Sequence, residues 1–476
     1  MGRWATVGVV ALAAALFLFR LGSAPTTINS EERCEEVVRR MLDSGDWLLP
    51  RMGDAPRVNK PPLFYWLSCL CCKAAGGFGL APFRLPNAVA GIGLVLLALA
   101  WGRELRAPRE GVLAAALLLV TYESLVQGRR GSFEMLLAFF CGASLLAGYR
   151  AATSGRLAPA LLATLCFGLA FLTKATPALL FAPLPLAVWT IARGRWRSLF
   201  GARVWGLSLA ALALGLSWHL YMVAFHPETR RIFVSQFFLP FGVEAGAPAT
   251  ARHLEPWWWY LGELFRKGFL LAFFIPLALV RVWAGRSERW ESPWRLLLLA
   301  FVLPLLVLTC LPSKQDHYYL PALLPLALAV ARGMTWAVDE VRAVALALLR
   351  IPAALCLTAS LLGGVVAGGL LDIFGAGPSL ACWLAGIGVS SLAIASFAGL
   401  AARRWRLAAA TGFLSAMLVW LAYFAAVRPL VDGFESGKIY SDPSYDAAAW
   451  DARFHEYPLL AAGLHVHPPP APPKKR

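Results

Sequence analysis

The sequence predicts an all-α membrane protein with many spans, and two observations carry this prediction. Of its 476 residues, 59% are hydrophobic and only 15% are charged, whereas a soluble protein has about 25% charged residues. Apolar runs of about 20 residues, the length that crosses a bilayer as a helix, recur between residues 4 and 427. These runs leave no stretch for a sizeable water-soluble core, which excludes a soluble enzyme, a disulfide scaffold and a disordered chain.

About thirteen spans are predicted from these runs. They lie at residues 4–22, 84–102, 111–127, 134–149, 157–173, 175–192, 204–224, 268–285, 296–311, 318–333, 351–372, 379–401 and 407–427. Some neighbouring spans are separated by only one or two residues, so the number of spans could differ from thirteen by one or two. The first run follows Arg3 and is not followed by a convincing small-residue cleavage site; we therefore expect a retained helix and not a signal peptide.

Arginine predicts the orientation, because positive residues are enriched in short cytoplasmic loops. The arginines fall in alternate loops, with Arg3 and then groups near residues 103–109, 150–156, 193–203, 281–295, 332–350 and 403–406. The remaining loops, including 23–83 and 225–267, are then outside. We expect one region at 1–335 with both long outer loops, C-terminal helices at 336–427, and a short outer tail at 428–476 whose proline-rich end is disordered.

The net charge of +17 would indicate a nucleic-acid partner in a soluble protein. Arginine at the cytoplasmic ends of spans explains most of it, so we expect a membrane and no nucleic acid; the excess also suits an anionic lipid or phosphate substrate. The nine cysteines lie mostly in apolar runs, where thiols act as small hydrophobes. The sequence predicts no disulfide framework and no metal site at Cys69, Cys71 and Cys72, which lack a second pair.

The first outer loop predicts two interfacial helices. A run of helix-capping residues ends at Ser30 and precedes an amphipathic segment at 31–42, which we expect to lie on the membrane. After a turn at Gly53, the proline pair Pro61-Pro62 precedes an apolar run at 63–70, which is short for a membrane span. We expect this second helix to hold Phe64, Tyr65 and Trp66 at the level of the lipid headgroups. The aromatic run 256–260 in the second outer loop is typical of an interfacial belt.

Charged residues gather in the predicted outer loops, although Lys and Arg are usually enriched in cytoplasmic loops. They are Glu31, Arg33, Lys60, Arg129, Arg130, Glu134, Lys174, His253, Arg266, Lys267, Lys314 and His317. Cations retained on the translocated side indicate that something anionic binds there. The segment 312–319 is notable because it places Lys314, Asp316 and His317 in one tight membrane turn.

These residues indicate acid–base and phosphate chemistry. The sequence contains no phosphate-cradling glycine loop, dinucleotide fingerprint or HExxH motif. Glu31 or Glu134 would serve as general base towards an acceptor hydroxyl or amine; the alternative is a helix-start carboxylate stabilised by the dipole. Lys60, Lys174 and Lys314 would neutralise a phosphate leaving group; the alternative is lysine snorkelling at the interface.

At these residues the sequence resembles a known family. The first outer loop, with Glu31-Glu32-Arg33, the string 41–51 and Asn59-Lys60-Pro61-Pro62, is similar to that of bacterial aminoarabinose transferase-like and protein O-mannosyltransferase-like enzymes. Further matches follow in order at 133–140, 172–174, 253–260 and 313–321. The resemblance covers about residues 1–335 and implies a C-type glycosyltransferase fold and a polyprenyl-phosphate sugar donor, such as an undecaprenyl phosphate sugar.

The resemblance also implies roles for single residues. A first-loop carboxylate supplies the base, assigned to Glu31, with Glu134 as the supporting acid in place of the family's Asp. The lysine before the proline pair is Lys60, which contacts the donor phosphate. Arg33, Lys314 and His317 match further donor-phosphate positions.

Two departures from the family pattern are present. Aligning Arg33 with the family's arginine puts Ser30 at the first position of an acidic pair. Either Glu31 takes the role, which we favour, or a one-residue shift makes Glu31-Glu32 the pair, or this chain has altered or lost its activity. Asn59 stands where the aminoarabinose branch has Glu, so a divalent metal near His253 and the aminoarabinose substrate are both in doubt, and we assign no metal ligands.

The sequence therefore predicts a glycosyltransferase of the cell envelope. It would move a sugar from a polyprenyl-phosphate carrier to a lipid, glycan or protein acceptor on the periplasmic face of a bacterial inner membrane. The alternatives are a transporter or flippase of a lipid-linked sugar and a non-catalytic binder of one. Long outer loops and the absence of an internal repeat favour the enzyme.

Overall fold

The computed structural model of the protein describes residues 3–23, 26, 29–53, 55–230, 232–233, 255–268, 270–285 and 290–340. The last three predicted spans, the tail 428–476 and His253 lie outside these residues. The chain divides into two compact units, and the described residues fall almost entirely in the first, which comprises residues 1–22 and 30–356. This unit is described below.

The described part of the first unit is helical apart from one short hairpin. Its long helices are α1 (Arg3–Leu18), α2 (Asn29–Ser44), α3 (Leu63–Ala74), α4 (Leu80–Glu104), α5 (Pro108–Val120), α7 (Glu134–Ser154), α8 (Leu157–Lys174), α10 (Pro183–Ala192), α11 (Ala202–Phe225), α13 (Trp259–Gly268), α15 (Ile275–Ala284), α16 (Pro293–Cys310) and α17 (Leu323–Glu340). Shorter helices are α6 (Tyr122–Gly128), α9 (Ala178–Phe181), α14 (Leu270–Phe273) and the 3-10 turns η1 (Trp196–Phe200), η2 (Pro227–Thr229) and η4 (Leu320–Ala322). The hairpin pairs β1 (Arg51–Met52) with β2 (Ala55–Pro56), placing Arg51 opposite Pro56.

Within the described residues, six helical segments are long and apolar enough to cross a membrane, or seven if α5 and α6 form one bent span. They correspond to seven of the predicted spans, from 84–102 to 318–333. The helical fold and the multi-pass membrane character are therefore confirmed. The helices α1 and α9–α10 are shorter than a full span, and the total of thirteen remains a prediction.

Three predicted spans are interrupted, because the backbone hydrogen bonds of a straight helix fail at identifiable residues. The predicted span 111–127 bends by 71° between α5 and α6, where Thr121 is extended and its Oγ1 donates to the Leu117 carbonyl instead. The span 175–192 breaks between α9 and α10, just before Pro183, and the span 268–285 breaks between α14 and α15, just before Pro276. Proline lacks the N–H that would continue each ladder.

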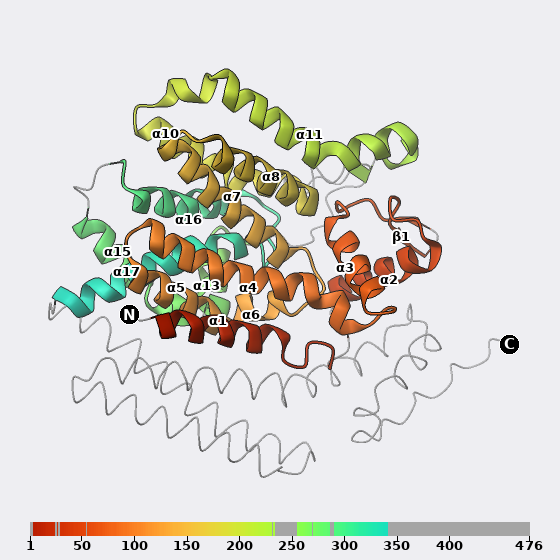
Figure 1. Cartoon of the computed structure of the whole chain (residues 1–476), viewed down its shortest axis with the longest axis horizontal. Coiled ribbons are helices and arrows are strands. Elements are labelled where there is room, and N and C mark those ends of the chain that lie inside the picture. The colour runs from red at the N-terminus through yellow and green to blue at the C-terminus, as the bar shows by residue number, and fades with distance from the viewer. Residues whose placement is uncertain are drawn as a thin grey trace, which may run out of the picture. The chain divides into compact units, whose positions relative to one another are not determined.

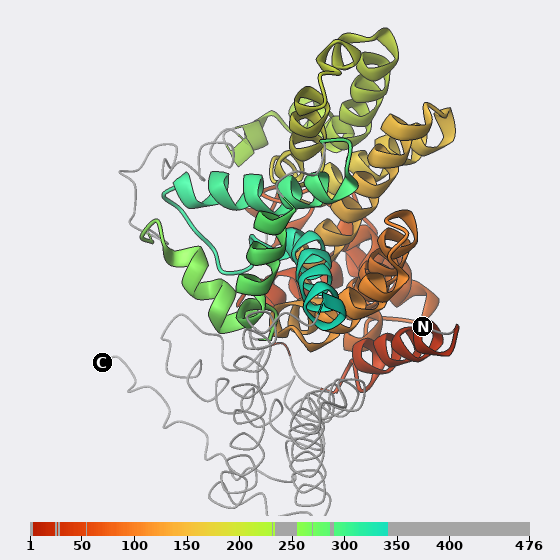
Figure 2. The ribbon, with the colours of Figure 1, turned by 90° about the vertical axis from the view of Figure 1, so that its left-hand side faces the viewer.

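Pairs of packed helices make up the bundle. The helix α7 packs along α8, α11 covers α8, α4 packs on α5 and α7, and α17 on α5. Figure 1 shows α11 on one side of the bundle and α1 on the other. The helix α17 also packs on α15 and α16, and Figure 2 shows these green to cyan helices from the side. The α4–α5 crossing is close because Gly102 faces Gly111: a Cβ on either would overlap the other's backbone.

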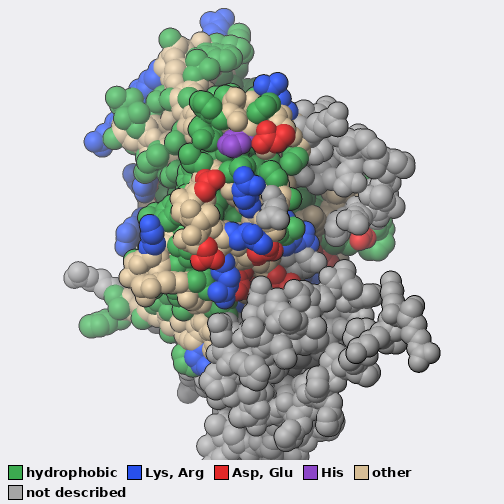
Figure 3. Space-filling model, turned by 90° about the vertical axis from the view of Figure 1, so that its right-hand side faces the viewer, with side chains coloured by type: hydrophobic (Ala, Val, Ile, Leu, Met, Phe, Trp, Pro, Cys, Tyr) green, Lys and Arg blue, Asp and Glu red, His purple; other side chains and the backbone are tan. Residues whose placement is uncertain are grey.

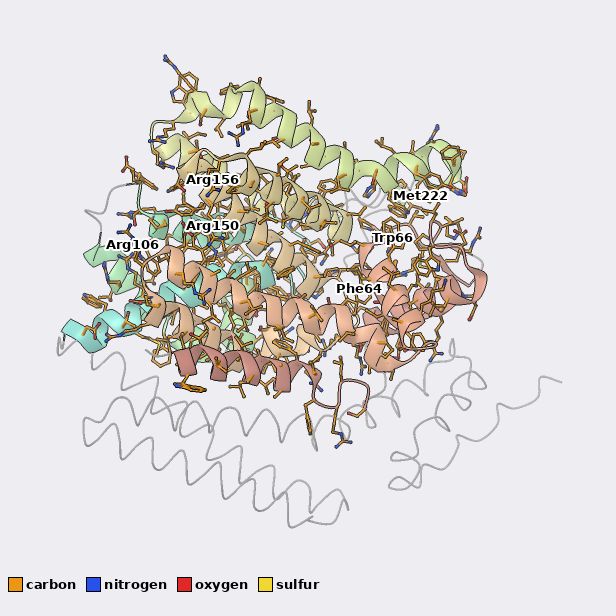
Figure 4. All side chains as sticks on the ribbon, viewed as in Figure 1. Phe64, Trp66, Arg106, Arg150, Arg156 and Met222 are labelled. Carbon is orange, nitrogen blue, oxygen red and sulfur yellow. The ribbon has the colours of Figure 1, made fainter. Side chains whose placement is uncertain are left out.

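The two ends of the helices differ in character. Arg106, Arg150 and Arg156, all from predicted cytoplasmic loops, lie at one end, and Phe64, Trp66 and Met222 lie at the other (Figure 4). The predicted alternation of loops between two ends is thus confirmed for these residues. The helices α2 and α3 and the hairpin share the end opposite the arginines (Figure 1).

The first outer loop folds onto the protein. In α2 the apolar side chains of Val37, Val38 and Met41 are buried in the protein, which satisfies the amphipathic pattern without lipid. Phe64 and Tyr65, which we expected at the level of the headgroups, are both 0% exposed and are therefore buried within the protein. The reason is aromatic packing: their rings meet Phe133 with centroids 5.5 and 5.3 Å apart.

Candidate active site

A short loop between α6 and α7 positions the first part of the site. The Asn87 side chain on α4 donates to the carbonyls of Arg130 and Ser132, each at 2.6 Å. Gly131 lies between them, where a Cβ would overlap the Phe83 ring. This close approach leaves room only for glycine, and it directs the Gly131 N–H towards the carboxylate of Glu31 at 2.7 Å.

Glu31 is buried at the first turn of α2 and is 1% exposed. Its Oε1 accepts from the Arg84 Nε at 2.7 Å as well as from Gly131. Arg84 is also buried and donates to the Leu21 carbonyl at 3.0 Å. Glu31 therefore links α2, α4 and the loop before α7. Its use as a base would require the acceptor to reach a carboxylate that this conformation encloses.

Glu134 begins α7 and forms the centre of the site. The Lys174 Nζ, at the end of α8, donates to its two oxygens at 2.6 and 2.5 Å. The antiparallel α7–α8 hairpin explains this meeting, because the first residue of one helix lies beside the last residue of the other. The His317 Nε2 approaches Glu134 Oε1 at 3.2 Å from the loop before η4.

Lys174 is followed by a strained residue. Ala175 has φ of 55° and ψ of −125°, a combination that favours glycine because an L side chain is crowded there. Its N–H donates to the Phe171 carbonyl at 2.6 Å. The strained turn ends α8 at Lys174, so that the lysine side chain lies at the helix terminus facing Glu134.

The pairing continues as a chain of alternating charges through Lys174, Glu134, His317, Asp316, Lys267 and Glu123, called the ion-pair chain below. The Asp316 Oδ1 lies 3.0 Å from His317 Nδ1, its Oδ2 contacts Lys267 Nζ, and Lys267 lies 3.4 Å from Glu123. These residues come from α6, α7, α8, α13 and the loop before η4. Alternation of sign offsets the desolvation that isolated buried charges would suffer.

The electrostatics of the loop residues follow from these neighbours. Burial lowers the pKa of His317. The charge of Glu134 and the hydrogen bond with Asp316 raise this pKa by more than burial lowers it, so the net shift is upward and the imidazolium is favoured. The hydrogen bond from His317 and the Lys267 charge hold the pKa of Asp316 well below its usual value. The neighbours therefore favour the imidazolium of His317 and the carboxylate of Asp316.

Lys60 lies beside this chain and in front of the Pro61-Pro62 pair that leads into α3. Burial of its ammonium and the nearby Lys174 charge lower the pKa of Lys60 to about 8, although Glu134 acts in the opposite direction. Among the described residues, none of the ion pairs within 4.0 Å includes Lys60. A cation held close to another cation, and not neutralised by a carboxylate, is suited to binding an anion.

The structure brings some of the predicted residues together and leaves others apart. Glu134 and His317 are in contact. Burial is the main cause that raises the pKa of the Cys34 thiol to about 12, and the charges of Glu31 and Glu134 also raise it. Glu134 therefore lies near Cys34 on α2, the helix that carries Glu31. Lys314 is buried and donates to the carbonyls of Glu255 and Leu311 at 2.9 and 2.7 Å, with no described contact to the ion-pair chain. Arg33 is exposed on α2.

Several residues of the site were not singled out from the sequence. Arg84 and Glu123 are charges within predicted apolar spans, and this signal could have found them, because ionisable residues inside spans mark functional sites by default. Asp316 was noted only as part of its turn. No sequence signal distinguished Arg57, which lies near Lys60 and Arg33.

The end of the bundle that carries these residues combines both signs of charge with apolar surface (Figure 3). In the part of the chain that the structure describes, no group of three or more His, Cys, Asp or Glu side chains is arranged to hold a metal ion. The predicted metal near His253 falls on a residue outside that part.

Comparison with known proteins identifies relatives. The dolichyl-phosphate-mannose-protein mannosyltransferase family matches residues 59–222. An undecaprenyl phosphate-alpha-4-amino-4-deoxy-L-arabinose arabinosyl transferase of Pseudomonas savastanoi is 30% identical over 353 residues, covering 71% of this chain and 63% of the relative. A transferase of the same description from Pseudomonas fluorescens is 29% identical, covering 72% and 58%. The chain is a relative of the polyprenyl-phosphate-sugar glycosyltransferases.

The fold agrees with this relationship. The crystal structure of ArnT from Cupriavidus metallidurans bound to undecaprenyl phosphate superposes with a TM-score of 0.69 at 19% identity, covering 92% of this chain and 80% of that one. The chain thus has the fold of ArnT. It spans 58% and 63% of the two curated transferases that it matches.

Proposed function

We propose that the protein is an integral membrane glycosyltransferase that moves a sugar from a polyprenyl-phosphate carrier to a lipid, glycan or protein acceptor. One observation carries the proposal: Lys60 lies beside the Glu134–Lys174–His317 cluster without a carboxylate partner of its own in the described residues. A carboxylate and a group of cations are what a transfer from a lipid phosphate needs. The names of the relatives and the undecaprenyl phosphate bound to ArnT support the choice of donor.

The proposed reaction is a single displacement. The acceptor oxygen or nitrogen attacks C1 of the sugar, the bond from C1 to the phosphate oxygen breaks with its electron pair going to the phosphate, and a carboxylate takes the acceptor proton. Glu31 is our candidate base, because it is the first-loop carboxylate and it pairs with Arg84 and accepts from the Gly131 N–H. Glu134 would support it by fixing the positions of Lys174 and His317.

Lys60 would bind the phosphate and stabilise the charge that develops on it as the bond breaks. His317, whose pKa Glu134 and Asp316 raise, would add a second positive donor in its imidazolium form. Arg33 and Lys314 are further candidates for the phosphate. For Lys314 this requires the ammonium to exchange the Glu255 carbonyl for a phosphate oxygen.

We further propose that the reaction takes place on the periplasmic face of a bacterial inner membrane. The site lies at the end of the bundle opposite Arg106, Arg150 and Arg156 (Figure 4), and arginine-rich loops are typically cytoplasmic. The lipid carrier would reach the site through the bilayer. The interfacial location of α2 and α3 belongs to this proposal.

The experiment is turnover of purified protein with radiolabelled polyprenyl-phosphate sugars and a membrane extract as acceptor. The variants Glu31→Gln, Glu134→Gln and Lys60→Ala should lose transfer while the protein stays folded. The matched control is Glu104→Gln, which removes an ion-paired carboxylate bonded to Arg150 at 2.7 Å, at the C-terminal end of α4. Full activity of Lys60→Ala would refute the assigned site.

The same preparation separates the alternatives. A transferase that uses Glu31 as base loses product formation in Glu31→Gln but keeps donor binding. Binding of a lipid-linked sugar with no product from any donor would instead indicate a flippase or a non-catalytic binder. Such a result would also agree with the alternative that this chain has lost its activity because Ser30 replaces the first acid of the family's acidic pair.

A further inference from the structure

A pocket lies between α15, α16 and α17, and three half-buried arginines line it. Each helix contributes one of them: Arg281 on α15, Arg295 on α16 and Arg332 on α17. The pocket holds about 390 Å³ of space that no atom fills, part of which is open to the outside. None of the described residues that line it is acidic. Its wall therefore carries charge of one sign.

The pocket lies at the arginine-rich end of the bundle, opposite the candidate active site. The helix α17 follows the loop that carries His317 and runs towards the start of α5, where Thr335 donates to the Glu110 carboxylate at 3.0 Å. Arg106, which precedes α5, lies at the arginine-rich end (Figure 4). In the orientation proposed above, this end is cytoplasmic.

Packing holds the arginines at the pocket. The guanidinium of Arg332 lies 4.3 Å from the centroid of the Trp294 ring, a distance at which a cation and an aromatic face attract each other. The Arg295 Nη2 donates to the Gly285 carbonyl at 3.2 Å. The helices α15 and α17 cross so closely that a Cβ on Gly333 would overlap the α15 backbone. The pocket is therefore part of the packed structure of these helices.

The pocket changes from cationic at its rim to apolar in its depth. On each helix an apolar lining residue lies three positions from the arginine, always towards the active-site end: Ala278 before Arg281, Leu298 after Arg295 and Ala329 before Arg332. Three positions correspond to about 4.5 Å along a helix axis. This order matches a phospholipid in the bilayer, whose phosphate lies outside its acyl chains.

We propose that this pocket binds the headgroup of an anionic phospholipid from the leaflet at the arginine-rich end. Guanidinium groups form strong charge-assisted hydrogen bonds to phosphate oxygens, and basic pockets between membrane helices on the cytoplasmic side suit acidic headgroups. The enrichment of arginine in cytoplasmic loops does not by itself place three arginines from three helices around one pocket. Two of them, Arg281 and Arg332, lie inside predicted spans, where ionisable residues are costly without a function.

The ligand differs from the lipid-linked sugar proposed as donor, because it enters at the opposite end of the bundle. The test is native mass spectrometry of the detergent-solubilised full chain titrated with phosphatidylglycerol, with phosphatidylcholine of the same acyl chains as the zwitterionic probe. We expect the wild type to bind phosphatidylglycerol about tenfold to a hundredfold more tightly than phosphatidylcholine. A bound anionic lipid should also raise the unfolding temperature.

Two single variants and their combination test the arginines. Arg295→Gln and Arg332→Gln should each weaken phosphatidylglycerol binding by about fivefold, and the double variant by about twentyfold to thirtyfold. Binding of phosphatidylcholine should change little. Ala329→Phe tests the pocket itself, because it fills the space without removing a charge, and it should also weaken phosphatidylglycerol binding. If Arg332→Gln does not fold, Arg295→Gln and Ala329→Phe decide the matter.

The matched control is the double variant of Arg156→Gln and Arg203→Gln. Both arginines are exposed and lie outside the pocket. They are at the same end of the bundle, since Figure 4 places Arg156 there and Arg203 donates to the neighbouring Gly155 carbonyl at 2.7 Å. The control removes as much charge as the double variant of the pocket and should bind phosphatidylglycerol as the wild type does.

Equal affinity of the wild type for the two phospholipids would overturn this inference. The same loss of phosphatidylglycerol binding in the control as in the double variant of the pocket would also overturn it, because the charge of the whole end would then explain the binding. Glycerophosphoglycerol, the same headgroup without acyl chains, should bind far more weakly. If it binds as tightly as phosphatidylglycerol, the pocket takes a soluble phosphate ester and the assignment to a phospholipid is wrong.

Discussion

The charge state of Lys60 should limit donor binding at alkaline pH. Its pKa of about 8 lies well below the value near 10.4 of a free lysine, so the ammonium is about nine-tenths charged at pH 7 and about one-tenth charged at pH 9. The sign is fixed by the chemistry: a lowered lysine pKa means that the positive charge is lost as the pH rises through about 8. A site that needs this charge loses affinity in the same interval.

The assay is the dissociation constant of undecaprenyl phosphate measured from about pH 7 to about pH 9.5, where the phosphate charge is nearly constant because its second pKa is about 6. We expect affinity to fall by about tenfold per pH unit above pH 8 until the pKa of the bound state is reached. In Lys60→Arg the guanidinium stays charged throughout, so the fall should disappear. Thermal unfolding over the same range is the control for stability.

His317 also carries a raised pKa, and it provides an internal comparison. A fall in affinity caused by deprotonation of His317 would persist in Lys60→Arg, whereas a fall caused by deprotonation of Lys60 would disappear. If Lys60→Arg and the wild type lose affinity with the same midpoint, the alkaline limit does not come from Lys60 and the reasoning is refuted.

Three further predictions concern the scaffold, each read from thermal unfolding of the detergent-solubilised protein. Arg84→Met removes the ion pair of the buried Glu31 and should destabilise the fold by about 3–5 kcal/mol; an unchanged unfolding temperature would argue against this ion pair. Gly131→Ala forces a Cβ into the Phe83 ring and should cost about 1–3 kcal/mol, whereas Gly262→Ala, which meets nothing within 4 Å, should change stability little. Ala175→Gly relieves the strained backbone after Lys174 and should stabilise by about 1 kcal/mol, and a lower unfolding temperature would contradict the strain.

Hydropathy was sufficient for the helices and their order, because a span of apolar residues has few alternatives in a bilayer. It could not predict the bend at Thr121 or the breaks before Pro183 and Pro276, where a straight helix and a broken one have the same composition. The alternation of arginine loops predicted which residues share an end, as Arg106 and Phe64 illustrate.

The site was predictable in its residue types and only partly in its contacts. Glu134, Lys174 and His317 were all expected on one side, but their pairing depends on which helix ends are neighbours in the bundle. Glu31 was expected as an outer-side carboxylate at the start of an interfacial helix, and its ion pair with Arg84 was not predicted, because the arginine comes from a different helix 53 residues away. The burial of Tyr65 within the protein was not predicted, because an aromatic residue at the headgroup level and one in a protein core look alike in sequence.

The α7–α8 hairpin has a consequence for biogenesis. A lysine at the translocated end of a helix opposes the usual charge bias during insertion, and an ionised residue within the bilayer costs about 2.5–3.5 kcal/mol on insertion scales. Glu134 and Lys174 begin and end one helical hairpin, so they can neutralise each other while the hairpin enters the membrane, before the ribosome has synthesised His317. The pair that organises the site would thus also let its two charges cross the bilayer as a neutral unit.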